Sequence, residues 1–288
     1  MNLKFALIFA VSELVCWVVG GVRLGAEDSR PEREKPVNVL VLMTDDFSRH
    51  CVTATGGKQS LTPNIDALAK RGTVMSNTVH QGGFSGAICT CSRAMLLTGR
   101  ALWSVTPQEL SYKGPAQLNT ADTLLPEQFR NEGWDTFATG KWHNGNAALL
   151  RGFDHAEAVT GGMLPFNLRD RGGARDNAIE IGMMDPSGVR INSDGKIEKH
   201  QSKGWSTDVF YDAAELFLDQ TWDRKKPFMM YISTNAPHDP RHVPAGILGR
   251  FTDVKEPPNY LPIHPFDNGD MNVRDEMVYK PPHRPETV

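Results

Sequence analysis

The fold is decided by the stretch Val37-Asn38-Val39-Leu40-Val41-Leu42-Met43-Thr44-Asp45-Asp46. Its first seven residues form a nearly continuous aliphatic run, which is typical of a central strand buried on both faces of an α/β sheet. Two carboxylates, Asp45 and Asp46, follow at once. Ligands in open α/β sheets bind beyond the carboxyl ends of the strands. The stretch therefore predicts an α/β fold with a ligand site at the edge of the sheet where this strand has its carboxyl end. The alternative is that these residues only stabilise a turn, as a single Asp after a strand often does.

Helices and strands alternate along the rest of the chain. Hydrophobic spacing and end signals predict helices over residues 62–72, 92–98, 124–133 and 206–220, and strands over 73–79, 136–139 and 227–232. This alternation predicts a central, mostly parallel sheet flanked by helices. Residues 161–204 are rich in Gly, Asp, Arg and Asn, and we interpret them as loop.

Composition and charge narrow the class of protein. The 288 residues carry a formal net charge of -3 and form no strongly basic patch, so no nucleic-acid partner is expected. With 40% hydrophobic and 23% charged residues the chain has the composition of a soluble globular protein. Its length suits one large domain or two small ones.

The N-terminus has the pattern of an export signal. Lys4 precedes an apolar stretch over residues 5–22, and cleavage is expected after Ala26. A retained anchor is the alternative, because about 18 apolar residues is near the lower limit for spanning a bilayer. We expect residues 1–26 to be a signal peptide and the protein to be periplasmic or extracellular, without stable membrane insertion after cleavage. Residues 27–36 are predicted to be a charged linker.

Removal of the signal would leave three cysteines, Cys51, Cys89 and Cys91. An odd number in an exported protein argues against a disulfide framework and indicates another fate for one thiol. Cys51 and Cys91 could stay reduced or pair.

Further polar groups follow the other predicted strands. Lys141 and His143 come just after residues 136–139, and His238 follows residues 227–232 in a loop that prolines stiffen. A lysine can supply a fixed positive charge, and a histidine can transfer protons. A structural turn is the alternative interpretation of each loop.

These groups are expected to meet at one edge of the sheet. Asp45 and Asp46 would bind a hard cation such as Ca²⁺, or possibly Mg²⁺, since such ions prefer carboxylate oxygens. Arg93, Lys141 and the two histidines would bind an anion together with the start of the helix at Ser92. A site for both a cation and an anion suits a sulfate or phosphate ester.

The cysteine run resembles a known signature. Cys89-Thr90-Cys91-Ser92-Arg93-Ala94-Met95-Leu96-Leu97-Thr98-Gly99-Arg100 is similar to the sulfatase pattern C-x-P-S-R-x-x-x-L-T-G-R, with Cys91 in place of proline. Residues 38–46, 62–69, 140–143 and 236–238 resemble four further sulfatase motifs in the same order. The resemblance covers residues 37 to about 240 and implies the alkaline-phosphatase-like sulfatase fold.

The resemblance also implies a mechanism. Cys89 would be oxidised to formylglycine by a formylglycine-generating enzyme, and residue 89 would bind the metal with Asp45 and Asp46. A hydroxyl of the hydrated aldehyde would attack sulfur and displace the alcohol. Lys141 and His238 would stabilise the sulfate, His143 would assist its release, and Arg93 would hold residue 89. The expected substrate is a sulfated small molecule, above all a sulfated carbohydrate.

Two departures from the family pattern bear on activity. Cys91 lies within the segment that the converting enzyme recognises. Sulfatases also carry a C-terminal stretch with further metal ligands, so residues 37–288 are expected to be an incomplete N-terminal catalytic domain with the C-terminal part missing. Asp267-Asn268-Gly269 is interpreted as a turn rather than as those ligands. An inactive relative is one alternative; a phosphoester or phosphonate hydrolase is less favoured because those mostly use Thr or Ser where Cys89 stands.

Overall fold

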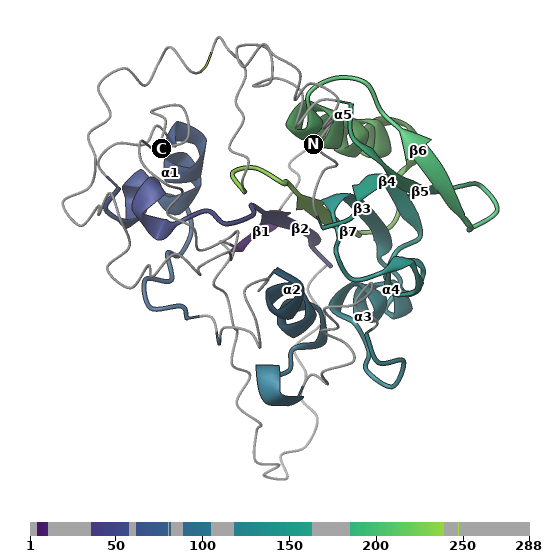
Figure 1. The fold of residues 1–288 in the computed structure, drawn as a ribbon, viewed down its shortest axis with the longest axis horizontal. Helices are drawn as coiled ribbons and strands as arrows, with labels where there is room; N and C mark the ends of the chain where they lie inside the picture. The colour runs from purple at the N-terminus through teal and green to yellow at the C-terminus, as the bar shows by residue number, and fades with distance from the viewer. Residues whose placement is uncertain are drawn as a thin grey trace, which may run out of the picture.

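One sheet organises the part of the chain that the structure describes (Figure 1). The computed structural model describes the backbone of residues 5–10 and, in full, residues 36–57, 62–79, 81, 89–104, 118–162, 185–238 and 247. Within these ranges seven strands pair in the order β1-β2-β7-β3-β4-β5-β6. They are β1 (Phe5–Ala10), β2 (Asn38–Met43), β3 (Asp135–Lys141), β4 (His155–Thr160), β5 (Ser187–Ile191), β6 (Ile197–Gln201) and β7 (Phe228–Ser233).

The sheet is mostly parallel, as predicted. β1, β2, β7, β3 and β4 pair in parallel, while β5 and β6 add an antiparallel edge. In this order β2, β7 and β3 are direct neighbours. Their carboxyl ends, which carry the polar groups predicted from the sequence, therefore lie side by side.

Helices flank both faces of the sheet (Figure 1). The helices are α1 (Pro63–Ala69), α2 (Cys89–Thr98), α3 (Leu125–Asn131), α4 (Asn146–Gly152) and α5 (Ser206–Leu216), which a π-helical turn (Phe217–Thr221) extends. α2, α3 and α4 pack on one face and α5 on the other. The predicted α/β fold with a helix-flanked sheet is confirmed.

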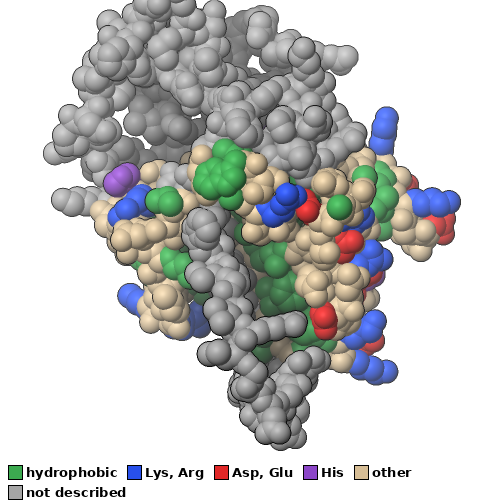
Figure 2. All heavy atoms as spheres, turned by 90° about the horizontal axis from the view of Figure 1, so that it is seen from below, with side chains coloured by type: hydrophobic (Ala, Val, Ile, Leu, Met, Phe, Trp, Pro, Cys, Tyr) green, Lys and Arg blue, Asp and Glu red, His purple; other side chains and the backbone are tan. Residues whose placement is uncertain are grey.

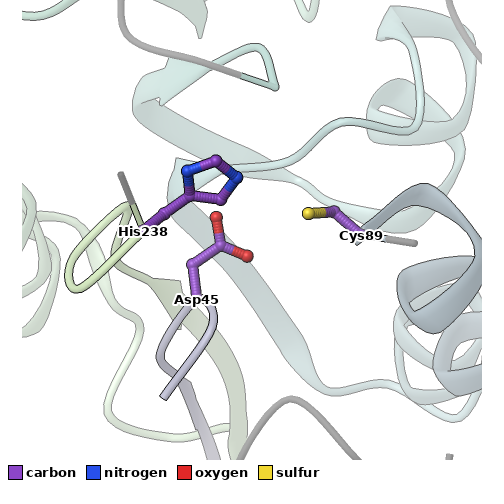
Figure 3. A group of neighbouring side chains, drawn as sticks. All are labelled: Asp45, Cys89 and His238. Carbon is purple, nitrogen blue, oxygen red and sulfur yellow. The ribbon is translucent and has the colours of Figure 1, made fainter. Parts of the chain in front are cut away.

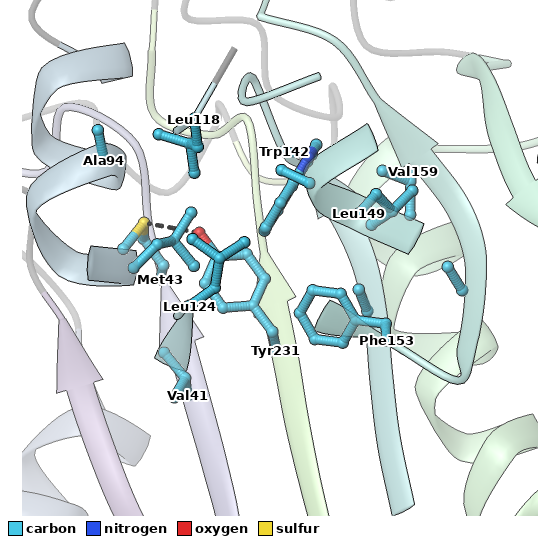
Figure 4. Close-up of a cluster of buried hydrophobic side chains, with 14 of the residues drawn as sticks. Val41, Met43, Ala94, Leu118, Leu124, Trp142, Leu149, Phe153, Val159 and Tyr231 are labelled. Atoms are coloured by element: carbon cyan, nitrogen blue, oxygen red, sulfur yellow. Dashed lines mark hydrogen bonds between the residues drawn. The ribbon is translucent and has the colours of Figure 1, made fainter. Parts of the chain in front are cut away.

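The larger core lies between the sheet and α2, α3 and α4 (Figure 4). Val39, Val41 and Met43 point into it from β2, because alternate residues of a strand face the same side. Tyr231 of β7 lies among them, and its hydroxyl donates to the sulfur of Met43 over 3.3 Å. Leu40 and Leu42 face the second cluster, under α5. Both faces of β2 are thus covered, as its apolar run predicts.

One predicted strand is wrong. Residues 73–79 form no strand, and Val74, Met75 and Val79 are exposed. β-Branched residues favour a strand only when a pleated, half-buried surface is available to them. No described neighbour offers such a surface to residues 73–79, so their local sequence pattern did not lead to a strand.

The interpretation of residues 161–204 as loop is also partly wrong. Their described part contains β5 and β6, which form a hairpin. The side chain of Asn192 accepts hydrogen bonds from the backbone of Asp194 and Lys196, and Gly195 adopts a left-handed φ of 71°. The turn Asn192-Ser193-Asp194-Gly195 is a hairpin signal that the high content of polar residues concealed.

β1 falls within the predicted signal peptide. It pairs with β2, so cleavage after Ala26 would leave β2 as an edge strand. The boundaries 1–26 and 27–36 remain predictions. Across the described ranges, no helix combines the length and apolarity needed to cross a membrane.

The described surface mixes charges of both signs. In Figure 2, lysine and arginine side chains are interspersed with aspartate and glutamate on the face shown. One such pair joins Arg190 Nε and Glu198 Oε2 across the β5–β6 hairpin, 3.1 Å apart.

Candidate active site

The loops after β2 and β7 are held together at the carboxyl edge of the sheet. The backbone N–H of Thr234 donates to the carbonyl of Met43 over 2.9 Å, and that of Asp45 donates to the carbonyl of Ala236 over 3.3 Å. These bonds continue the β2–β7 pairing past the ends of both strands. They bring Asp45 and Asp46 close to the loop that carries His238.

Asp45 shares its carboxylate between two buried cations. Arg93 Nη2 lies 3.3 Å from Asp45 Oδ1, and Lys141 Nζ contacts Asp45 Oδ2. The three residues are 1–3% exposed. Buried charges are stable only when they are paired and hydrogen-bonded, and this triad meets that condition.

The charges of the triad affect the protonation of Asp45. Burial acts to raise its pKa, but the positive charges of Arg93 and Lys141 outweigh burial and hold the pKa below its ordinary value. Asp45 is therefore ionised throughout the neutral range.

Arg93 is fixed by groups that the sequence analysis did not identify. Its Nη1 donates to the carbonyl of Lys141 (2.7 Å), to the Tyr231 hydroxyl (3.0 Å) and to Ser233 Oγ (2.8 Å). Tyr231 and Ser233 lie two apart on β7 and so face the same side. Tyr231 falls inside the predicted strand 227–232 and Ser233 just after it, and their hydroxyls next to an otherwise apolar strand were the available signal.

A glycine makes this arrangement possible. Gly140, directly before Lys141, has a φ of 85°, and a Cβ there would come within 1.8 Å of the Ser233 carbonyl oxygen. Only a residue without a side chain allows β3 and β7 to approach so closely in this conformation. Gly140 thereby brings Lys141 and Ser233 to the same buried arginine.

Cys89 joins this edge from the opposite side (Figure 3). It is the first residue of α2, and its sulfur points toward the neighbouring side chains of Asp45 and His238. One ligand atom of each residue lies within 4.8 Å of the others. Asp46 contacts the same histidine, with its Oδ2 3.4 Å from His238 Nε2. The structure thus groups Asp45, Cys89 and His238, and places Asp46 beside His238.

The space between these groups has the size of a single ion or water. A cavity of about 20 Å³ is lined by Asp45, Asp46, Cys89, Ser92 and Arg93, among others. A water needs about 10–15 Å³. Carboxylate oxygens suit a hard cation, whereas a thiol does so only after replacement by an oxygen group. Asp45, Asp46 and an oxygen group at residue 89 suit Ca²⁺ or Mg²⁺ in chemical kind, but the residues whose ligand atoms lie within reach of one another are Asp45, Cys89 and His238.

The other cysteines lie apart from this cavity. Cys91 is buried in the core and Cys51 is exposed, and among the described residues no cysteine forms a disulfide. Of the two alternatives, reduced or paired, the structure has the reduced one. Cys89 and Cys91 are two apart on α2, and such residues do not face each other on a helix.

His143 lies next to the triad in a rare backbone conformation. Its φ of 61° places it in the left-handed region, which non-glycine residues seldom adopt outside turns and functional sites. Burial, followed by the positive charges of Lys141 and Arg93, lowers the pKa of His143 to about 4. The imidazole is therefore neutral at physiological pH and able to accept a proton.

This pKa predicts a pH-dependent stability. The unfolded chain binds a proton at His143 near pH 6.5 and the folded chain only near pH 4, so the free energy of unfolding falls as the pH drops between these values. We expect wild type to lose on the order of 2 kcal/mol more than His143→Asn between pH 7 and pH 5. Asn tolerates a left-handed φ and does not titrate. Urea unfolding at both pH values measures the difference; equal losses would contradict the shifted pKa.

Comparison with known proteins agrees with this arrangement. The family model described as Sulfatase matches residues 37–279. The chain belongs to the sulfatase family. The match includes every group described above, from Asp45 to His238.

Characterised members of the sulfatase family are similar over most of this chain. The arylsulfatase of Klebsiella aerogenes is 26% identical over 257 residues, which cover 84% of this chain and 50% of that protein. The N-acetylglucosamine-6-O-sulfatase of Bacteroides thetaiotaomicron is 30% identical over 241 residues, covering 81% and 37%. The chain thus spans half or less of the length of these two relatives.

A solved structure extends the comparison to three dimensions. It shows a protein in complex with its substrate D-glucosamine-2-N,6-O-disulfate and is 28% identical to this chain. The TM-score is 0.54, with 77% of this chain and 39% of that one covered. The sulfatase fold that the motifs implied is confirmed, and the turn predicted at Asp267-Asn268-Gly269 lies outside the described residues.

Proposed function

We propose that this chain contains the part of the active site that supplies the nucleophile in a sulfuric ester hydrolase, an enzyme that cleaves sulfate monoesters. The observation that carries the proposal is the position of Cys89. It begins α2, faces Asp45 and His238, and lies beside two buried cations. Membership of the sulfatase family gives this geometry its chemical meaning.

Two components of the proposed site must be added to the unmodified chain. They are the modified residue 89, which would act as nucleophile, and a metal ion. Formylglycine at residue 89 would supply an oxygen nucleophile in its hydrated form, and Ca²⁺ or Mg²⁺ would supply Lewis acidity. Asp45 and Asp46 would hold the cation. A formylglycine-generating enzyme is the expected partner in maturation.

The chain's own cations would attract and orient the ester. Arg93 and Lys141 place two positive charges at the site, offset by the single charge of Asp45 within the triad. The remaining positive charge favours an anionic sulfate group next to residue 89. Lys141 Nζ contacts Asp45 in the present structure, so its contact with sulfate is a further part of the proposal.

The two histidines would divide the proton transfers. His143 is neutral at physiological pH, which suits acceptance of a proton during sulfate release. His238 Nε2 lies 3.4 Å from Asp46 Oδ2, next to the cavity that Cys89 and Asp46 line. A protonated His238 can donate to the departing alcohol.

A sulfated carbohydrate is the proposed substrate class. His143 lines a cavity of about 910 Å³ together with Asn146, Thr160, Lys199 and Gln201, among others. This volume is at the upper end of the range for small-molecule sites, and its mostly apolar lining, which includes Trp142, carries a few polar groups that could bind sugar hydroxyls. The glucosamine derivative named for the solved relative belongs to the same class. We also propose that the protein is exported, because residues 1–26 have the pattern of a signal peptide.

Two measurements test this function together. In protein co-expressed with the converting enzyme, mass spectrometry of the peptide containing residue 89 is expected to show loss of the thiol and gain of an aldehyde. The same preparation is expected to hydrolyse an aryl sulfate and a glucosamine sulfate faster than an aryl phosphate. A calcium chelator is expected to abolish the turnover, because the cation would offset charge in the transition state.

The variant Cys91→Pro separates poor maturation from lack of activity. Cys91 is the third residue of α2, where the backbone N–H has no helical partner and proline is tolerated. Proline there restores the family signature. An unmodified thiol at Cys89 in both wild type and Cys91→Pro would refute the proposed hydrolase function. Faster turnover of the aryl phosphate would instead identify a phosphoester hydrolase.

A further inference from the structure

Gly162 lies directly against the imidazole of His143. A Cβ built at Gly162 would lie 2.4 Å from His143 Nε2, 2.6 Å from Cε1 and 2.8 Å from Cδ2. All three distances are shorter than any ordinary carbon contact. The ring therefore occupies the space that a side chain at position 162 would need.

The backbone of Gly162 gives no other reason for glycine. Its φ lies outside the range from +20° to +160°, so an L-residue would adopt the same conformation without the strain of the left-handed region. The obstacle to a larger residue is the imidazole alone. This separates Gly162 from Gly140, where both the backbone conformation and a main-chain contact require glycine.

The backbone segments that carry the two residues are fixed to each other. The N–H of Trp142 donates to the carbonyl of Thr160 over 3.0 Å, which ties the end of β3 to the end of β4. The Trp142 indole donates to the carbonyl of Gly145 over 2.7 Å and closes the loop that contains His143. Because both sides are held, a methyl group at position 162 would have to displace the ring.

The ring has little else to hold it in place. Its Nδ1 is buried and has no hydrogen-bond partner among the described residues. Contact with Gly162, together with the left-handed backbone at His143, therefore sets the direction in which the ring nitrogens point. The charges of the triad act on this ring, and the ring also lines the cavity of about 910 Å³, together with Gly161 and Gly162.

We propose that Gly162 is a positioning residue of the active site, which fixes the proton-accepting imidazole of His143 by van der Waals contact. Its effect on catalysis rests on the proposed sulfatase function, whereas its effect on the ring does not. Displacement of a reacting group by about 1 Å can cost ~10²-fold in rate. Gly162 is thus expected to matter through kcat rather than through the stability of the fold.

The adjacent glycine provides a matched control. A Cβ at Gly161 would meet nothing within 4 Å, and its φ is also outside the left-handed range. We expect Gly162→Ala to lower kcat for an aryl sulfate by ~10²-fold with a smaller change in KM. Because Gly161 also lines the cavity, Gly161→Ala is expected to change KM but to lower kcat far less than Gly162→Ala does, and to unfold at the wild-type denaturant concentration. Equal kinetics for the two variants would overturn the proposal.

A second background shows whether the effect passes through the ring. In His143→Gly the imidazole is absent and the left-handed backbone is retained at no steric cost. Adding Gly162→Ala to this background is expected to lower the residual rate by less than about twofold, because coupled residues are non-additive. A further loss of the full ~10²-fold would show that Gly162 acts elsewhere.

Ring spectroscopy keeps this inference separate from the proposed function. With ¹⁵N-labelled histidine, Gly162→Ala is expected to shift the ring resonances of His143, assigned through their absence in His143→Gly, while Gly161→Ala leaves them in place. If wild type lacked sulfatase activity, the proposed function would fail and these spectra would still decide the positioning role. Unshifted resonances in Gly162→Ala would refute it.

Discussion

Cys89→Ser is expected to lower sulfate-ester hydrolysis by at least roughly 10³-fold, because loss of a nucleophile that works with neighbouring groups costs this much or more. The Cys89 sulfur lies within 4.8 Å of ligand atoms of Asp45 and His238, and Cys89 lines the cavity of about 20 Å³ together with Asp45. A serine would form a sulfate ester that must itself be hydrolysed, which a hydrated aldehyde avoids. Initial rates with an aryl sulfate, set against wild type matured in the same host, measure the effect.

Cys51→Ser is the matched control for this prediction. Cys51 is free, as Cys89 is, but it is exposed and does not line the cavity at the active site. The same chemical change there is expected to leave the rate within about twofold, since surface substitutions away from such features have small effects. A Cys89→Ser protein that retained most of its activity would remove residue 89 from the reaction.

The sequence predicted that these groups would meet at one edge of the sheet, because the signals for this are local. Asp45, Lys141 and His238 each stand just past a buried strand, and parallel strands bring such positions to one edge. What it did not predict depends on contacts between distant segments. Tyr231 and Ser233 approach Arg93 only once β7 lies between β2 and β3, and the sequence alone does not give this strand order.

Secondary-structure predictions from the local sequence pattern failed where contacts with distant segments determine the structure. The stretch 73–79 has strand-like residues but no described partner, whereas β5 and β6 form from a segment whose Gly, Asp and Asn content indicated loop. The contact of Gly162 with His143 has no local signature at all, because it joins the ends of two strands.

Asp45→Asn is expected to lower the free energy of unfolding by about 3–5 kcal/mol, as removal of one partner from a buried ion pair does. Asp45 is the carboxylate that contacts both Arg93 and Lys141, which are each 1% exposed. Asparagine keeps the size of the side chain but leaves two buried cations without a counter-charge. For a chain of this size the midpoint of thermal unfolding should fall by about 6–20 °C. Measurement at pH 7 with a chelator present excludes any contribution from bound metal.

Glu198→Gln removes a carboxylate from an ion pair that is exposed to solvent, whereas the pairs of Asp45 are buried. Arg190 and Glu198 are 41% and 45% exposed, and solvent-exposed pairs of this kind contribute little to stability, so a much smaller loss is expected. The contrast between the two variants therefore isolates the effect of burial. The double variant Asp45→Asn/Lys141→Met is expected to lose less than the sum of its single variants, because it removes one of the stranded cations. Additive losses, or an Asp45→Asn protein as stable as Glu198→Gln, would show that the triad does not hold the two cations as the structure has them.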